Sequence, residues 1–298
     1  MRLTLALAGL AVLAAGCGVG GGEPPDEPAA GRPSPPPPAA SAPARYEATA
    51  TVLEAPGRGP MLCLGPMLMS LPPQCGDVRL AGWSWDAVDG AQEHTGVRWG
   101  AFHVVGTYDG ETFTVLAAGP PEPAPTAPAD DMFLPPCPEP EGGWLAGSPA
   151  APSQEDTDAA EGYSTRQPEY VRSWVYHVTE PDRPGPDQYE EDLPVVYVAV
   201  FTGDAARHES ELRARWQGPL CVIERPVVSA REGRRIRAEA EASLSELGLQ
   251  MLASWEGEIG LAAEIEVVAD PDGAGQAAFD ERFGPGLVRL VPALRPVG

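Results

Sequence analysis

The chain has 298 residues and a formal net charge of −23 at pH 7, with 43 acidic residues against 20 basic ones. All the basic residues are arginine, and the sequence also lacks asparagine. A surface with this charge repels nucleic acid and anionic lipid headgroups over a long range, so we expect no nucleic acid among the partners. The length allows one to three domains and at least one sizeable core.

Residues 1–17 read as an export signal. Arg2 precedes the apolar run LTLALAGLAVLAA, which is too short to span a bilayer comfortably. The following LAAGC resembles a bacterial lipobox, although Leu13 stands one position further upstream than in the usual pattern. We therefore expect Cys17 to carry lipid and to anchor the chain to the membrane. The alternative is an ordinary cleaved signal peptide and a secreted protein.

Residues 18–44 form a Gly- and Pro-rich segment, GVGGGEPPDEP followed by AAGRPSPPPPAASAPA. Glycine adds flexibility, proline adds extended stiffness, and neither buries much apolar surface. The composition therefore predicts a disordered tether that holds a folded region away from the membrane.

Beyond Cys17 the chain keeps an even number of cysteines, which in an exported protein predicts two disulfides. They are Cys63, Cys75, Cys137 and Cys221. Three connectivities are possible. The first two flank a short Pro-rich loop, which favours a bond between them and leaves the other two to pair. Free buried thiols or a metal site are the alternatives, but the spacing matches no zinc pattern and the chain has only four histidines.

Residues 45–117 are predicted to form a small N-terminal β domain. The stretches YEATATVLE and VRLAGWSWDAV alternate in hydrophobicity, and Asp109-Gly110 marks a hairpin between AFHVVGTY and ETFTVLAA. Four or five short strands bury their inner faces most simply in a barrel-like sheet, and an OB-like barrel is one candidate. Residues 118–152 are rich in proline and acid and contain no arginine. They are predicted to be an irregular linker, pinned in part by Cys137 and Trp144.

Residues 153–298 contain two similar phrases, LRARWQGPLCVIE at 212–224 and FDERFGPGLVRLV at 279–291, which start 67 positions apart. At this offset apolar residues coincide: Leu212 with Phe279, Trp216 with Phe283, Val198 with Ile265. The pattern around each phrase predicts the order helix, strand, strand, helix, strand.

The predicted fold class is therefore α+β. A small N-terminal β-barrel-like domain precedes a C-terminal α/β sandwich region of two similar α-β-β-α-β units, about 153–225 and 226–298. The second unit is also similar, at the level of fold alone, to the pro-regions of secreted proteases, and this likeness carries no function.

Several long stretches carry a resemblance to a family. They are LCLGPMLMSLPPQCGDVRLAGWSWDAV with WGAFHVVGTYDGETFTV, and FTGDAARHESELRARWQGPLCV with DERFGPGLVRLVPALRPV. They resemble uncharacterised exported proteins and lipoproteins of actinobacteria, over most of residues 46–298. The resemblance implies an extracytoplasmic location and the architecture above, and it implies no activity.

The segment DPDGAGQAAFDE partly matches a calcium-binding EF-hand loop. The matching positions one, three, six and twelve are Asp270, Asp272, Gly275 and Glu281. Position five is Ala274, which has no ligand atom, and a predicted strand replaces the helix that should precede the loop. A strand-to-helix turn is the preferred interpretation, so we expect no metal and no other cofactor.

Two further sets are candidates for ligand contact. Trp83 and Trp85, two apart in a predicted strand, would point to one face and could stack on cell-wall glycan, although core packing is the preferred interpretation. The arginines of REGRRIR could dock a phosphate-rich wall polymer. They are Arg231, Arg234, Arg235 and Arg237. Glu239 and Glu241 lie four residues after the last two, which favours a self-paired, solvated helix face.

The sequence contains no HExxH, G-x-S-x-G or P-loop motif, and the acidic pairs fall in loops. Glu209, beside His208, lies on a polar helix face and is interpreted as a surface residue. We therefore expect a lipid-anchored extracytoplasmic module without catalysis, which binds an envelope protein or a cell-wall glycan. The alternatives are an envelope hydrolase with a site between the β domain and the α/β domain, and an accessory subunit whose two units grip another exported protein.

Overall fold

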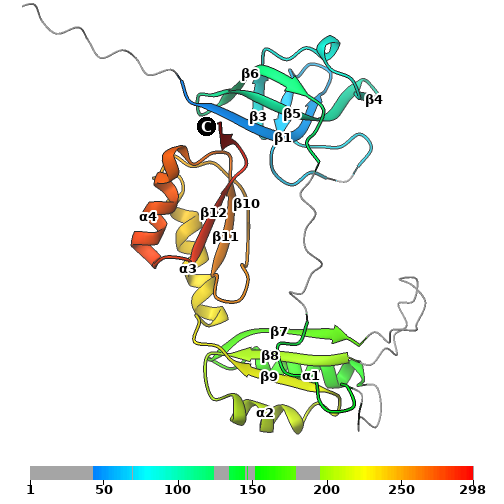
Figure 1. Ribbon diagram of the computed structural model, residues 1–298, viewed down its shortest axis with the longest axis vertical. Helices are drawn as coiled ribbons and strands as arrows, with labels where there is room; N and C mark the ends of the chain where they lie inside the picture. Colours follow the sequence, from blue (N-terminus) through cyan, green and yellow to red (C-terminus); the bar gives the residue numbers. More distant parts are fainter. Residues whose placement is uncertain are drawn as a thin grey trace, which may run out of the picture. The chain divides into compact units, whose positions relative to one another are not determined.

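The computed structural model describes residues 43–68, 70–123, 134–144, 146, 152–178 and 195–297. Across these residues the chain is a mixed α+β protein with three β-sheets and four α-helices, as the sequence predicts (Figure 1). The export signal, the lipidation site Cys17 and the tether up to residue 42 lie outside the described residues, and so does much of the linker.

The N-terminal region builds most of a seven-stranded sheet with the order β13-β1-β2-β3-β6-β5-β4. Its strands are β1 (Arg45–Glu54), β2 (Met61–Cys63), β3 (Val78–Ala81), β4 (Gln92–His94), β5 (Val97–Tyr108), β6 (Thr112–Gly119) and β13 (Arg295–Pro296). β1 also pairs with β5 along its whole length, so β1, β2, β3, β6 and β5 form a ring of hydrogen-bonded neighbours. All pairs in this ring are antiparallel except β3 with β6.

The hairpin between β5 and β6 forms where Asp109-Gly110 predicts it. The Asp109 carboxylate accepts hydrogen bonds from the backbone N–H groups of Glu111 at 2.9 Å and Thr112 at 2.7 Å. Gly110 adopts a φ of 101°, which a side chain would disfavour. The short strand β4, which pairs with the start of β5, has no clear signal in the sequence.

The core of the β domain includes residues from the C-terminal end of the chain. Val52, Leu62, Phe102 and other side chains of the sheet pack with Val268, Ala269 and Leu294. β13 pairs with the start of β1, on the edge opposite β5. The β domain therefore does not end at residue 117, because three buried side chains and one strand come from the last 31 residues.

Residues 153–297 contain two sets of elements in the same order. The first set is α1 (Gln154–Ser164), β7 (Tyr170–His177), β8 (Val195–Phe201), α2 (Ala205–Arg213) and β9 (Leu220–Glu224). The second is α3 (Ala230–Ser243), β10 (Met251–Trp255), β11 (Ala263–Val267), α4 (Ala274–Phe283) and β12 (Val288–Pro292). In each set the first two strands are antiparallel and the last two are parallel.

Each three-stranded sheet buries one face under its two helices. Tyr197 and Ala199 of β8 pack with Leu212 and Trp216. In the second set, Ile265 packs with side chains of α3 and with Phe279 of α4. Serine caps start the first helix of each set: Ser153 and Ser229 accept hydrogen bonds from the backbone N–H groups three residues on.

The constant offset of 67 holds for helix residues and fails for the central strands. It matches the buried helix residues Leu212 and Phe279. Val198, however, packs on the face of β8 away from the helices, whereas Ile265 faces the helices. The predicted match of these two residues is therefore wrong: the alignment is displaced by one residue in this strand, and a displacement by one residue exchanges the two faces of a strand.

Two disulfides join the cysteines in the pairs that the spacing favours. They are Cys63–Cys75 and Cys137–Cys221. Cys137 and Trp144 of the linker pack against Val196 and Val198, on the face of the first sheet that the helices leave open. The linker is thus held against a sheet. Because the Cys137–Cys221 bond closes a long loop, it lowers the entropy of the unfolded chain and stabilises the fold by roughly 3–5 kcal/mol in the chain-entropy picture.

Substituting Gly106→Ala should lower the free energy of unfolding by about 1–3 kcal/mol, the usual range for an overpacked site. A Cβ at Gly106 would lie 2.2 Å from the carbonyl oxygen of Thr114 and 2.5 Å from the ring of buried Phe113. Thermal unfolding followed by circular dichroism measures the loss. Gly59→Ala is the matched control, because nothing lies within 4 Å of its Cβ position. Equal stability of the two variants would contradict the described packing of β5 on β6.

Candidate functional site

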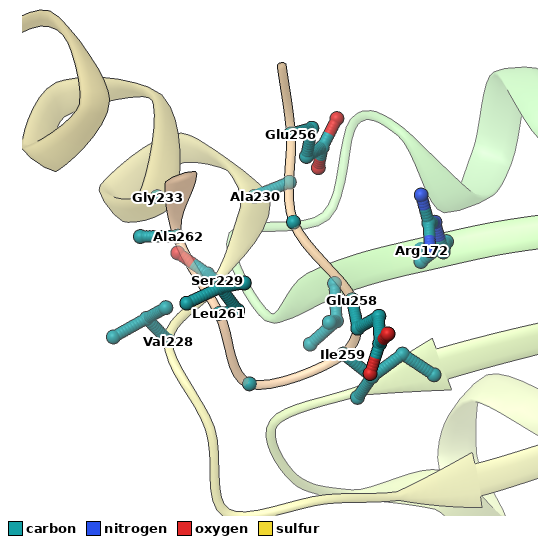
Figure 2. A pocket seen from close by; sticks show the side chains of 13 residues that line it. Arg172, Val228, Ser229, Ala230, Gly233, Glu256, Glu258, Ile259, Leu261 and Ala262 are labelled. Atoms are coloured by element: carbon teal, nitrogen blue, oxygen red, sulfur yellow. The ribbon is translucent and has the colours of Figure 1, made fainter. Parts of the chain in front are cut away.

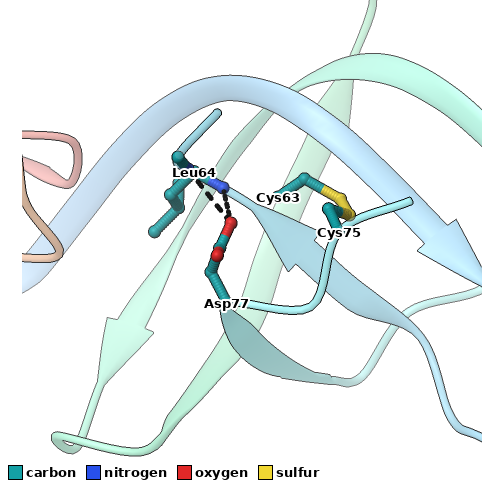
Figure 3. Close-up of a disulfide and its surroundings, with 5 residues drawn as sticks. Cys63, Leu64, Cys75 and Asp77 are labelled. Atoms are coloured by element: carbon teal, nitrogen blue, oxygen red, sulfur yellow. Dashed lines mark hydrogen bonds between the residues drawn. A yellow bond between two sulfur atoms is a disulfide. The ribbon is translucent and has the colours of Figure 1, made fainter. Parts of the chain in front are cut away.

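The disulfide Cys63–Cys75 closes the loop between β2 and β3, and Asp77 fastens the same base. One carboxylate oxygen of Asp77 accepts hydrogen bonds from the backbone N–H groups of Leu64 at 2.8 Å and Gly65 at 3.0 Å (Figure 3). A covalent bond and a pair of charge-assisted hydrogen bonds therefore hold both ends of residues 64–74. We call these residues the stapled loop; Met69 within it lies outside the described residues.

The stapled loop exposes large apolar side chains. Leu71 and Leu68 are 71% and 64% exposed, more than any other large apolar residue in the described part of the chain, and Met67 is also exposed. The whole stretch from residue 59 to residue 76 carries no charge, in a chain of which 21% is charged. Exposed apolar side chains gathered on one ordered element indicate an interaction site.

Part of the polar backbone of the stapled loop forms hydrogen bonds within the loop. The N–H of Leu68 donates to the carbonyl of Gln74 at 3.2 Å, and the N–H of Ser70 donates to the carbonyl of Leu68 at 2.9 Å. The Ser70 hydroxyl donates to the carbonyl of Pro72 at 2.8 Å. Pro66, Pro72 and Pro73 have no N–H at all. Several of the N–H groups of the loop are therefore absent or already bonded, whereas among its described carbonyls these hydrogen bonds occupy those of Leu68, Pro72 and Gln74.

The base of the loop lies against β10, an edge strand of the second three-stranded sheet. A Cβ at Gly65 would lie 3.2 Å from the Cβ of Leu252, so the loop base touches this strand. Met251 and Trp255, on either side of Leu252 along the strand, are 47% and 41% exposed. Sequence analysis did not select any of these residues, although the uncharged run 59–76 is the signal that could have found the loop.

Trp83 and Trp85 do not share a strand face, contrary to the prediction. β3 ends at Ala81, and Trp85 begins a short 3-10 helix, η1 (Trp85–Ala87). The two rings lie 5.3 Å apart at 85°, and both pack edge-on against buried Phe102. Half-buried, perpendicular rings form no flat platform for a sugar, which favours the core-packing interpretation.

A groove of about 530 Å³ lies beside Trp85, lined by the turn after β1 and by the end of β4 and the start of β5. Its charged side chains are Glu54, Arg58, Glu93 and Arg98. Glu54 accepts a hydrogen bond from Trp85 at 2.5 Å, and Arg98 pairs with Glu93 at 3.2 Å and lies over the Trp85 ring. Arg58 is exposed and forms no ion pair with any described residue, so its guanidinium is free for an anionic group.

A cleft of about 290 Å³ lies where the hydrolase interpretation expects one, between the β domain and the second α/β unit. Tyr108 and Asp109 line it from one side, Gln250 and Val268 from the other. Asp109 is its one carboxylate, and the two backbone hydrogen bonds of the hairpin hold the pKa of Asp109 below its ordinary value. The lining therefore holds one carboxylate, whereas glycoside hydrolysis commonly uses a pair.

A much smaller pocket, about 30 Å³, lies at the N-terminus of α3 (Figure 2). Ser229 and Ala230 of the helix start line it, together with Arg172 of β7 and the loop that carries Glu258 and Ile259. This volume holds about two water molecules and no larger ligand.

The arginines of α3 divide into two kinds. Arg235 pairs with Glu232 and Glu239, and Arg237 pairs with Glu241 at 3.3 Å, so the predicted pairs four residues apart form. Arg231 and Arg234 are exposed and form no ion pair with a described residue, although the charge of Arg231 contributes to lowering the pKa of Glu232. Only these two of the four predicted arginines are free for a polyanion.

Asp270 caps helix α4 and does not have the arrangement of a calcium ligand. Its two carboxylate oxygens accept hydrogen bonds from the backbone N–H groups of Gly275 at 2.8 Å and Gln276 at 3.0 Å. The strand-to-helix turn is thus the interpretation that the contacts support. In the described ranges no group of three or more His, Cys, Asp or Glu side chains could hold a metal ion.

His208 is fully buried at the start of α2, while Glu209 is exposed as predicted. Its ring stacks on Phe201 at 3.7 Å, and Nδ1 lies 3.0 Å from the Tyr163 hydroxyl. Nε2 lies 3.1 Å from a nitrogen of Arg207, which can only donate, so Nε2 accepts and Nδ1 carries the proton. Burial and the charge of Arg207 lower the pKa of His208 below its ordinary value of 6.5, against the opposing effect of Glu169. This neutral histidine is a core residue, because its side chain is fully buried.

No protein-family model, curated protein or solved structure matches this chain. The resemblance to exported actinobacterial proteins therefore stays a prediction. Among the helices that the structure describes, none has the length and apolar character to cross a membrane.

The burial of His208 predicts a loss of stability in mild acid. As the pH falls through about 6.5, the His208 side chain binds a proton in the unfolded chain but stays neutral in the folded chain. The free energy of unfolding therefore falls. Urea unfolding at pH 7.5 and pH 5.5 measures this, and His208→Gln should reduce the difference. His94→Gln, at an exposed position, should leave the difference unchanged. An undiminished pH dependence in His208→Gln would contradict this assignment.

Proposed function

We propose that the chain is a membrane-anchored extracytoplasmic lipoprotein that acts as a non-catalytic interaction module of the cell envelope. The two disulfides support the compartment, because such bonds persist in oxidising surroundings outside the cytoplasm. Cys17 lies outside both bonds and is the cysteine that the lipobox-like sequence offers for lipid. The single observation that carries the interaction role is the stapled loop, with Leu68 and Leu71 held in solvent.

We infer a scaffold of two parts for this module. The ring of β1, β2, β3, β6 and β5, with its parallel β3–β6 pair, supports an OB-like barrel in which the stapled loop joins the second and third strands. The shared element order and strand directions support a duplication of one α-β-β-α-β unit. With local shifts, the helix-facing residues agree: Tyr197 and Ala199 correspond to Ala263 and Ile265.

A cell-wall glycan is a second candidate ligand, and the groove beside Trp85 is the observation that favours it. OB-like barrels use the loop between the first two strands to bind oligosaccharides, and that loop supplies Arg58 to the groove. Carboxylates and guanidinium groups on one lining suit the hydroxyls and carboxylates of an acidic sugar. The stacking of sugar on Trp83 and Trp85 is not part of this proposal.

The envelope hydrolase stays as the alternative proposal. Glu266 of β11 supports it, because burial and the nearby charges of Asp77 and Glu264 raise its pKa, as a general acid requires. Both neighbours are otherwise engaged: Asp77 fastens the stapled loop, and Glu264 pairs with Arg289 at 3.1 Å. Neither is therefore a free base, which favours a module without catalysis.

Removing the lipid acceptor tests the anchor. In cells, Cys17→Ala should move the protein from the membrane pellet to the soluble or extracellular fraction, because a lipidated cysteine is the proposed attachment. Immunoblots of fractionated cells measure the shift, and metabolic labelling with a fatty-acid analogue should mark the unsubstituted protein only. Unchanged membrane recovery without labelling would contradict a lipid anchor.

Substituting Arg58→Ala tests the glycan groove. Loss of a charge-assisted hydrogen bond should weaken binding of soluble peptidoglycan fragments by about tenfold. Quenching of tryptophan fluorescence measures the affinity, since Trp85 contacts two side chains of the groove. Arg166→Ala, another exposed arginine, is the control and should bind like the unsubstituted chain. Equal affinities for all three proteins would exclude Arg58 from any glycan site.

A further inference from the structure

We propose that the stapled loop inserts its apolar side chains into the bilayer that carries the lipid anchor. This inference rests on the proposed function, because it takes the folded region to be tethered at that surface. The binding partner of the loop is thus the surface of the lipid bilayer. Apolar side chains enter such a surface at the boundary between headgroups and acyl chains, to a depth of about 5–10 Å.

The composition of the loop favours lipid over a protein partner. The residues that contribute most binding energy at protein interfaces are tryptophan, tyrosine and arginine, while leucine is under-represented among them; methionine is enriched at interfaces as well. Residues 64–74 contain none of those three types and consist mainly of Leu, Met and Pro. Hydrocarbon requires apolar area without directional contacts, which Met67, Leu68 and Leu71 provide.

The loop offers few free backbone N–H groups, which lowers one part of the cost of desolvation. Irregular backbone is excluded from hydrocarbon because its unpaired N–H and C=O groups lose their water. In the stapled loop, three prolines have no N–H, and Leu68 and Ser70 donate theirs inside the loop. The disulfide and Asp77 hold this arrangement from the base, so little conformational entropy is lost on insertion.

The length of chain between anchor and loop permits the contact. Residues 18–42 can span at most about 90 Å when fully extended. They join the fold next to β1, and Thr51 of β1 lies opposite Cys63 at the loop base, about 20 Å along the strand from Arg45. Anchoring makes insertion intramolecular, at an effective concentration in the millimolar range, and so adds to the affinity for lipid that the exposed loop has by itself.

Charge sets the lipid preference. The loop itself is neutral, but the net charge of −23 repels anionic headgroups within about a Debye length, close to 10 Å at 0.1 M salt. Insertion should therefore be stronger into zwitterionic than into anionic vesicles. Added salt should reduce this difference in binding, because it screens the repulsion.

The experiment uses the mature chain from residue 18, exported behind a cleavable signal so that its disulfides form and no lipid is attached. It is floated with vesicles of phosphatidylcholine, alone or mixed with phosphatidylglycerol. The chain should float with the zwitterionic vesicles, and Leu68→Ser with Leu71→Ser should lower its partition coefficient by about tenfold or more. Leu116→Ser is the matched control, because this leucine is 56% exposed on β6, outside the loop, and should not change partitioning.

Absence of flotation for the unsubstituted chain would overturn membrane insertion, and so would equal flotation of the double variant and the control. In either case the exposed leucines would be assigned to a contact with a protein instead. Circular dichroism of the double variant checks its fold. None of these outcomes depends on Cys17, so failure of the lipid anchor in cells and failure of insertion in vitro are distinguishable.

Discussion

The fastening of the stapled loop is the constraint on which the interaction surface depends. Exposed leucines on a free loop would collapse onto the nearest apolar surface, since burial is the favourable direction for apolar area. The Cys63–Cys75 bond and the Asp77 carboxylate prevent this by fixing both ends of a short, proline-containing segment. The same aspartate also ties the β domain to the α/β region, because its carbonyl accepts a hydrogen bond from the Gln250 side chain at 3.4 Å.

Local patterns in the sequence predicted the helices and strands of this fold better than they predicted which strands pair with one another. Helix α3, which begins after the Ser229 cap, and the hairpin at Asp109 follow from capping and turn chemistry acting over a few residues. The joining of β13 to β1 brings together residues about 250 positions apart, and no local pattern encodes that pairing. For the same reason the β domain was predicted to end at residue 117, although Leu294 lies in its core.

The repeat shows where periodicity misleads. Matching apolar letters at one fixed offset works along helices, in which Leu212 and Phe279 both face their sheets. In a strand buried on both faces, such as β8, every position is apolar and the letters no longer report direction. An alignment displaced by one residue therefore still matched apolar residues with apolar residues, although it assigned Val198 to the wrong face of the strand.

The site was harder to predict than the fold, because sequence reasoning searched for charged and aromatic groups. Trp83 and Trp85 met that search and proved to pack on Phe102, and the arginines of α3 partly neutralise themselves with glutamates. The stapled loop is defined by what it lacks, since no charge falls between residues 59 and 76. In a strongly acidic chain, a neutral run that remains exposed after folding carries more information about contact than any single charged residue. Its apolar character alone would be ordinary in a core strand; exposure on a fastened loop is what makes it the proposed surface for binding.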